Sequence, residues 1–343
     1  MKSLLLTTAL ALTAGGAFAE EIRVLNWQGY GTDLDWAVAD FTEKTGNTVV
    51  HEYFTSEQEM LTKLRTNPGA YDVVLINSAY TKQAKDEGLI DAIDTAKIAN
   101  FADLDPALTG NEDLNPGGQL SGVPWTWGLT SIAVNTADFA EMPTSLSVLW
   151  DPAWKGRVSI RDDGLEAVQF AAMATGQNIN EITDMAAVEA KLKELLPQIT
   201  TFWSSENDWN QFMSAGDFAV ATYWSGSAAR SLSKGLPIAF VVPEEGAIGW
   251  LDGLSIPTSS TKKDAAAAFI DWMVDPEFYV KWDAEGAPVS SNTKALAALP
   301  ETSFNRQLVA DPATVARVQF MRPVSDADRE TYLKLWQDMK AAQ

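Results

Sequence analysis

The 343-residue chain contains no cysteine. A chain without thiols forms no disulfide, holds no thiolate-bound zinc and has neither a cysteine nucleophile nor a cysteine for lipid attachment. Histidine is nearly absent too. The single one, His51, lies in a strand-like pattern without a second metal ligand nearby. No calcium-binding loop of the pattern D-x-[DN]-x-[DN]-G occurs. We therefore expect neither a metal site nor a cofactor.

Several motifs of enzymes are also missing. The sequence has no G-x-S-x-G, no P-loop and no G-x-G-x-x-G, so hydrolase, NTPase and dinucleotide functions lose their usual support. Basic residues are few as well, with 25 Lys and Arg against 46 Asp and Glu and a net charge of −21. Phosphate binding needs a basic face, so nucleic acid is not an expected partner. An acidic surface favours solubility and also attracts cationic ligands.

Long apolar runs are restricted to the N-terminus. Lys2 precedes the apolar run Leu4–Thr13, and Ala17-Phe18-Ala19 follows it. This pattern is typical of a cleavable signal peptide over residues 1–19, with cleavage after Ala19, and its apolar run is too short to span a bilayer. No later run approaches 18 apolar residues, so we expect an exported chain without a membrane anchor.

The remaining sequence alternates strand and helix signals, which predicts an α/β fold with parallel strands and right-handed crossovers. A length well beyond that served by one core predicts two lobes with a cleft between them. Strands are expected at residues 22–27, 48–53, 71–76, 131–135, 157–160, 218–223, 238–242 and 247–250. Helices are expected at residues 34–44, 56–64, 164–175, 185–196, 228–234, 264–274 and 326–342.

Three of these apolar runs end on a tryptophan: Trp27, Trp224 and Trp250. Ligands of open α/β sheets bind outside the carboxyl ends of the strands, so residues that close a strand are candidates for ligand contact. Flat aromatic faces attract an organic cation and bury its methylene groups. The alternative is that these side chains belong to the core, as most of the 13 tryptophans must.

Acidic residues follow two of the predicted strands, those at 157–160 and 247–250. Asp163 and Glu166 open the helix at 164–175, and Asp252 follows Trp250 by two residues, on the same side of an extended chain. All three carboxylates are candidates to bind an ammonium group. Structural alternatives are an N-cap for Asp163 with Glu166 at the third helical position, and a solvated turn for Asp252 before Gly253.

A pair of carboxylates is also what a glycoside hydrolase needs. The separation of two carboxyl groups in space does not follow from their spacing in sequence. A secreted carbohydrate-active enzyme therefore stays as an alternative of another class, although we expect no enzymatic activity.

Taken together, the chain resembles the polyamine-binding branch of the periplasmic solute-binding proteins that serve ABC importers. The stretches that carry the resemblance are Leu25–Tyr30, Phe41–Gly46, Gly69–Val74, Val123–Gly128, Trp224–Ala228 and Gly249–Pro257. The resemblance implies two α/β lobes that are joined by crossing strands and close on a ligand. Lobe 1 is expected to comprise residues 20–135 and 253–295, and lobe 2 residues 136–252 and 296–343.

The resemblance also implies roles for particular residues. An aromatic box would consist of Trp27, Tyr30, Trp224 and Trp250, and the ammonium-binding carboxylates would be Asp163, Glu166 and Asp252. Ser78 keeps a hydroxyl for ligand contact, although its neighbours differ from those of relatives.

Arg322 departs from the family pattern, since it aligns loosely with a glutamine that reaches the ligand. A guanidinium facing the cleft would favour a zwitterion such as a γ-amino acid. A guanidinium paired with a neighbouring acid would leave a polyamine as the better ligand, and we favour this second case.

The sequence thus predicts a monomeric periplasmic protein that binds putrescine or spermidine and delivers it to a permease in the inner membrane. Its proposed action is conformational, because the lobes would close over the ligand before docking.

Overall fold

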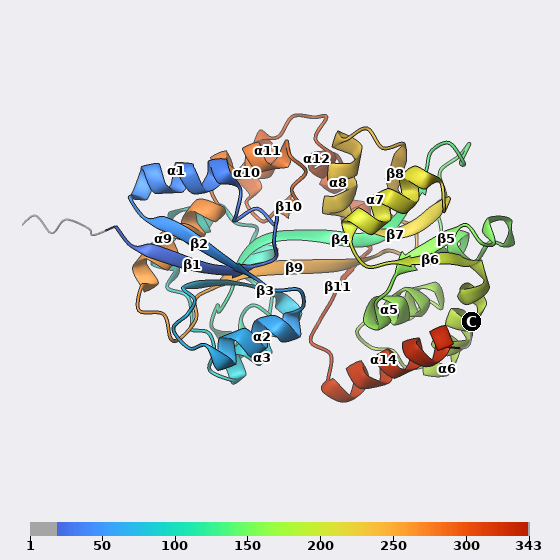
Figure 1. The fold of residues 1–343 in the computed structure, drawn as a ribbon, viewed down its shortest axis with the longest axis horizontal. Coiled ribbons are helices and arrows are strands. Elements are labelled where there is room, and N and C mark those ends of the chain that lie inside the picture. Colours follow the sequence, from blue (N-terminus) through green and yellow to red (C-terminus); the bar gives the residue numbers. More distant parts are fainter. Residues whose placement is uncertain (1–18, 342–343) are drawn as a thin grey trace, which may run out of the picture.

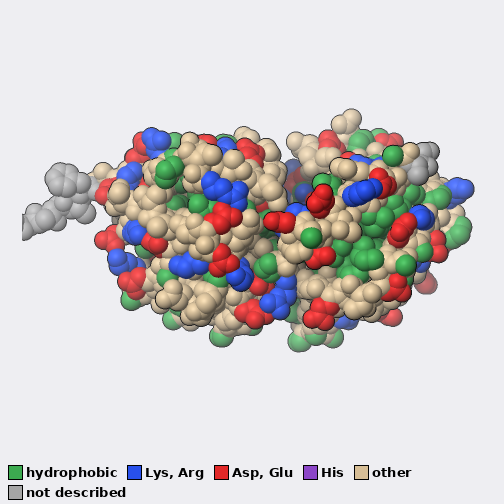
Figure 2. All heavy atoms as spheres, turned by 90° about the horizontal axis from the view of Figure 1, so that it is seen from below, with side chains coloured by type: hydrophobic (Ala, Val, Ile, Leu, Met, Phe, Trp, Pro, Cys, Tyr) green, Lys and Arg blue, Asp and Glu red, His purple; other side chains and the backbone are tan. Residues whose placement is uncertain are grey.

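The computed structural model describes residues 19–341 and has an α/β fold in two parts arranged along the long axis of the molecule (Figure 1). Nearly all of the predicted signal peptide lies outside the described residues. No helix within residues 19–341 has the length and apolar character needed to cross a membrane. Figure 2 shows acidic and basic side chains interspersed over one face, with a recess between the two parts.

The first part begins with the predicted β-α-β-α-β order. Its strands are β1 (Glu21–Asn26), β2 (Thr48–Tyr53) and β3 (Val73–Asn77), and the connected helices are α1 (Asp35–Thr45), α2 (Glu57–Thr66) and α3 (Ser78–Asp86). β1 pairs in parallel with both β2 and β3, so the prediction of parallel strands is confirmed here. The buried run of β3 faces helices on both sides, as its unbroken apolar sequence requires.

The second part repeats this plan with β5 at its centre. The elements are β5 (Val158–Arg161), α5 (Gly164–Ala174), α6 (Met185–Leu195), β6 (Ile199–Trp203), α7 (Glu206–Ala215), β7 (Val220–Trp224), α8 (Ser225–Ser233) and β8 (Ile238–Val241). β5 pairs in parallel with β6 and β7. The sequence patterns missed β6 and α7, although Ser205 and Asp208 form a capping box at the start of α7.

Two long strands connect the parts. They are β4 (Val123–Asn135) and β9 (Ala247–Ser255), which pair antiparallel with each other. β9 also pairs with β3 of the first part, and β4 with β7 of the second, so the sheet order is β2-β1-β3-β9-β4-β7-β5-β6. The prediction of crossing strands is thereby confirmed.

The predicted strand end at Trp250 is wrong, because β9 continues to Ser255. Asp252 and Gly253 read as a turn in the sequence, yet both are buried within the strand. Gly253 is used for close packing, since a Cβ there would lie 3.2 Å from Leu114. Gly128 on β4 serves the same purpose, because an added Cβ would lie 2.3 Å from the ring of Trp250. Trp250 is therefore in the middle of a crossing strand.

The chain then returns to the first part and crosses once more. The elements are α9 (Lys263–Met273), α10 (Pro276–Asp283), β10 (Val289–Ser290), α11 (Thr293–Ala298), α12 (Phe304–Val309), α13 (Pro312–Val315), β11 (Val318–Phe320) and α14 (Asp326–Ala341); the short α4 (Pro106–Thr109) precedes β4. The lobe boundary predicted at residue 295 falls inside α11, and Leu299 after this helix packs in the core of the first part. The exact residue ranges of the two lobes stay a prediction.

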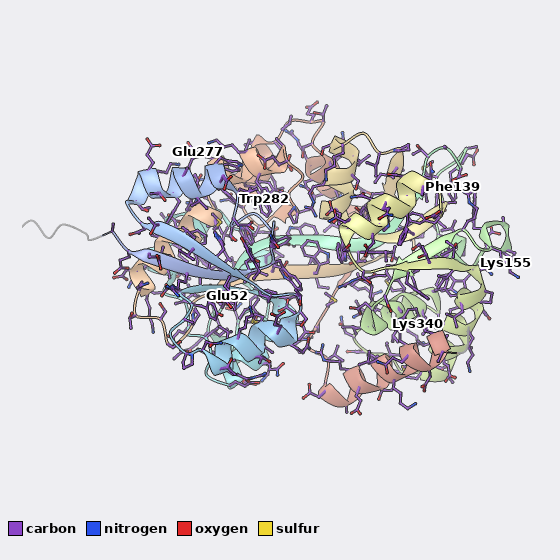
Figure 3. All side chains as sticks on the ribbon, viewed as in Figure 1. Glu52, Phe139, Lys155, Glu277, Trp282 and Lys340 are labelled. Atoms are coloured by element: carbon purple, nitrogen blue, oxygen red, sulfur yellow. The ribbon has the colours of Figure 1, made fainter. Side chains whose placement is uncertain are left out.

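The C-terminal helix α14 is attached to the second part. Trp336 packs in the core formed with α5 and α6, and its Nε1 donates a hydrogen bond of 2.9 Å to Asp162. Lys340, labelled in Figure 3, pairs with the same carboxylate. These contacts fix the segment before α14, which contains Arg322, relative to the second part.

Candidate functional site

A cavity of about 640 Å³ lies where the two parts meet. Strand ends and helix starts from both parts contribute to its wall, together with the middle of β9. Eight predicted site residues line this cavity: Trp27, Tyr30, Asp163, Glu166, Trp224, Trp250, Asp252 and Arg322. Ser78 is not among the lining residues, because it is buried in the first turn of α3 while its neighbours Asn77 and Ala79 form the wall.

The aromatic residues of the cavity are held by other rings. Trp27 packs edge-on against Phe54 with ring centroids 4.5 Å apart, and Trp224 packs against Trp203 at 4.8 Å. Such contacts leave little freedom at either ring. These aromatic walls are therefore rigid.

Tyr30 is held in the same way in the first part. Its ring meets those of Trp125 and Trp282 edge-on, at 5.6 and 6.0 Å. Trp125 and Trp282 in turn stack at 5.1 Å, and Trp282 is labelled in Figure 3. The tyrosine hydroxyl is thereby aimed at β9.

Asp252 occupies the centre of this arrangement. Its Oδ2 accepts a 2.8 Å hydrogen bond from the Tyr30 hydroxyl, and its Oδ1 accepts one of 2.9 Å from Asn77 Nδ2. The side chain is buried, and no Lys or Arg of residues 19–341 forms an ion pair with it. Burial raises the pKa of the carboxyl to about 6, although both hydrogen bonds oppose this rise. The alternative of a solvated turn is wrong, and the site presents an acceptor without a cation.

Glu57 is a lining residue that the sequence interpretation missed. It is the first residue of α2, next to Ser56, whose side chain caps the helix by accepting from Glu59 N at 3.2 Å. The Oε2 atom of Glu57 is buried and has no hydrogen-bond partner within the described chain. Burial and the charge of Asp252 raise the pKa of this carboxyl well above its ordinary value.

Asp163 and Glu166 lie at the start of α5 and also line the cavity. Asp163 Oδ1 accepts the backbone N–H of Glu166 at 3.0 Å, which confirms the N-cap, and both carboxylates also line the cavity. Burial raises the pKa of Glu166 to about 7, while the neighbouring guanidinium of Arg161 lowers it. One Glu166 oxygen, Oε1, is buried without a partner among residues 19–341.

Arg161 is the second lining residue that the sequence interpretation missed, although it is the last residue of β5 and the ends of strands are typical places for ligand contact. Its Nη1 lies 3.5 Å from Asp163 Oδ2 and 3.4 Å from Glu166 Oε2. The guanidinium carbon lies 4.9 Å from the centre of the Trp224 ring. Arg161 is therefore an internal cation between two predicted ammonium-binding carboxylates and an aromatic face.

Three further arginines line the cavity, and two of them, Arg230 and Arg329, contact acceptors that also line it. Arg230 Nε donates to Glu206 Oε2 at 2.9 Å and its Nη1 to the carbonyl of Gly286 at 2.9 Å. Arg329 bonds the hydroxyl of Tyr80 and stacks over its ring at 4.9 Å. Arg230 and Arg329 belong to the second part, so their contacts with Gly286 and Tyr80 connect it to the first part.

Arg322 lies at the rim of the cavity, with half of its side chain exposed. Its guanidinium pairs with Glu112 and lies 3.4 Å from Asp113 Oδ2. This is the paired arrangement that we favoured from the sequence.

Fold and site together define a two-part α/β binding protein that encloses a small ligand between its parts. Residues 36–313 match the family of bacterial extracellular solute-binding proteins, and the chain belongs to this family.

Relatives and solved structures agree with this membership. The chain is 33% identical to the spermidine/putrescine-binding periplasmic protein of Escherichia coli K12, over 99% of this chain and 98% of the relative. It is 29% identical to the spermidine/putrescine-binding periplasmic protein 1 of Haemophilus influenzae, over 96% and 91%. The structure of the spermidine/putrescine ABC transporter substrate-binding protein of Streptococcus pneumoniae superposes with a TM-score of 0.84 at 24% identity, covering 94% of this chain and 99% of that one.

Proposed function

We propose that this protein captures a polyamine, putrescine or spermidine, in the cavity and delivers it to an ABC permease in the inner membrane. The observation that carries the proposal is Asp252, a buried carboxylate with two fixed hydrogen-bond donors and no cationic partner among the described residues. An ammonium ion supplies the missing charge. The names of the relatives support the same ligand class.

The aromatic walls suit the rest of such a ligand. Burying four methylene groups between tryptophan faces contributes about 3 kcal/mol, and each cation–π contact about 0.5–2 kcal/mol. Trp27, Trp250 and Tyr30 line the same cavity as Asp252 and Glu57, and Tyr30 bonds Asp252 directly, so one primary amine is expected at these carboxylates.

Delivery requires a change of shape that a permease recognises. We infer closure of the two lobes over the ligand, in a monomer exported to the periplasm after removal of residues 1–19. We expect binding without turnover and no interaction with nucleic acid.

A zwitterionic amine, such as a γ-amino acid, is the second candidate ligand. The observation in its favour is Arg161, because a guanidinium binds a carboxylate in bidentate fashion. Its pairing with Asp163 and Glu166 through Nη1 weakens this case, since two carboxylates already neutralise its charge and would repel a third.

Calorimetry on the chain from Glu20 onward tests the proposal against putrescine, spermidine, γ-aminobutyrate and a β-linked disaccharide. We expect a heat of binding for putrescine and spermidine and none for γ-aminobutyrate or the disaccharide. Tight binding of γ-aminobutyrate without binding of either polyamine would contradict the proposal. Mass spectrometry of the same mixtures tests turnover, and products above those of a Glu166→Gln variant would show an enzyme.

A further inference from the structure

The two sides of the cavity differ in charge. On the side of the first part, Asp252 accepts hydrogen bonds from neutral donors, and Glu57 Oε2 is buried without a hydrogen-bond partner in the described chain. On the side of the second part, Arg161 lies between Asp163 and Glu166 and over the ring of Trp224. Two carboxylates and an aromatic face are what an organic ammonium would need. The chain's own guanidinium holds that place.

Arg161 is not readily displaced from this position. Its backbone N–H donates to Thr222 Oγ1 at 3.1 Å, which ties the end of β5 to β7. Its charge is permanent, because a guanidinium does not lose its proton in proteins. An incoming ammonium would have to break two ion pairs and a stacking contact to replace it.

The charges around the cavity limit the ligand further. Five carboxylates line it: Glu57, Asp163, Glu166, Glu206 and Asp252. Three lining guanidinium groups, those of Arg161, Arg230 and Arg329, lie within the same wall, whereas Arg322 pairs with Glu112 and Asp113. The lining carboxylates therefore exceed these guanidinium groups by two negative charges at most. Two negative charges balance a ligand with two positive charges, whereas a third ammonium group would have no counterion.

We propose that Arg161 is a specificity-determining residue that restricts the cavity to amines with two positive charges, so that putrescine binds in preference to spermidine. This inference depends on the proposed function, and it names the ligand within that class. Arg161 acts by occupying the place of an additional ammonium and by repelling one nearby.

Neutral substitution of Arg161 tests the inference. Arg161→Met keeps an unbranched apolar stem over Trp224 and removes the charge. Arg157→Met is the matched control, because Arg157 precedes the same strand, pairs with Asp138 at 2.9 Å and does not line the cavity. Calorimetry with putrescine and spermidine on the parent and both variants gives the ratio of the two affinities.

We expect the parent to prefer putrescine, and Arg161→Met to shift the ratio about 10- to 100-fold toward spermidine, because the repulsion between two charges is lost. Arg157→Met should leave the ratio unchanged. A parent that prefers spermidine, or a ratio that Arg161→Met does not move, would overturn the role of Arg161 while the proposed function stands.

Other outcomes separate the two proposals. A parent that binds neither amine refutes the proposed function itself. A parent that binds γ-aminobutyrate tightly and loses it in Arg161→Met shows that Arg161 binds a ligand carboxylate, which also overturns the inference. Circular dichroism verifies folding, and Arg161→Gln replaces Arg161→Met if the latter does not fold.

Discussion

Replacing Asp252 by asparagine removes the charge on which the proposed binding mode depends while keeping the size of the side chain. The carboxylate is buried, so the charge that an ammonium meets there is weakly screened. Removing one partner of such a desolvated pair costs about 2–5 kcal/mol. We expect the affinity for putrescine to fall by about 30-fold to several thousand-fold.

The same substitution should stabilise the protein in the absence of ligand. Burial raises the pKa of Asp252 from 3.8 to about 6, so the folded state holds the proton more tightly than the unfolded chain does. Stability is therefore lost as the pH rises between these values, and above pH 6 the penalty is about 3 kcal/mol. Asparagine avoids the penalty, but its single side-chain oxygen accepts only one of the two hydrogen bonds from Tyr30 and Asn77 in the same geometry. A net gain of about 1–2 kcal/mol at pH 7.5 remains.

Two measurements on one variant distinguish loss of the site from loss of the fold. Thermal unfolding without ligand should show a higher Tm for Asp252→Asn, and calorimetry should show weaker binding. Asp94→Asn is the control, since Asp94 is exposed, caps a short helical turn and does not line the cavity. Asparagine is an equally good cap, so neither quantity should change. Unaltered putrescine affinity in Asp252→Asn would refute the reasoning.

In the parent, the affinity for putrescine should decline as the pH falls below about 6, because a protonated Asp252 no longer attracts an ammonium.

Three further predictions concern single features. Glu57→Gln should weaken putrescine binding by about tenfold, as the second carboxylate beside Asp252 is lost, whereas the exposed Glu43→Gln should have no effect in the same titration. Arg322→Gln should change putrescine affinity by less than about fivefold, because half of its side chain is exposed and its ion pairs point to Glu112 and Asp113; a larger loss would place Arg322 in contact with the ligand. The exported chain should begin at Glu20, and an intact mass that includes residues 1–19 would contradict cleavage after Ala19.

Much of the architecture was predictable because it depends on local patterns. Alternating apolar runs and helix caps predicted most strands and seven of the fourteen α-helices of the described chain, and the ends of strands indicated Trp27 and Trp224 as candidates for ligand contact. Asp163 was correctly interpreted as an N-cap, since the pattern of a cap followed by Glu166 is contained in four residues. The sequence alone also determined the absence of thiol chemistry and the acidic character of the chain.

Tertiary structure decided the rest, because those features depend on which distant segments meet. A solvated turn was one of two alternatives for Asp252, and only the pairing of β9 with β3 places its carboxylate against Asn77 and Tyr30. Glu57 was not among the predicted site residues, and only the folded structure shows that its Oε2 is buried. Arg161 was an ordinary charge at the end of a strand in the sequence. Arg161 lies close to Asp163 and Glu166 in the sequence, but their spacing does not show that the turn from β5 into α5 brings the guanidinium within ion-pair distance of both carboxylates.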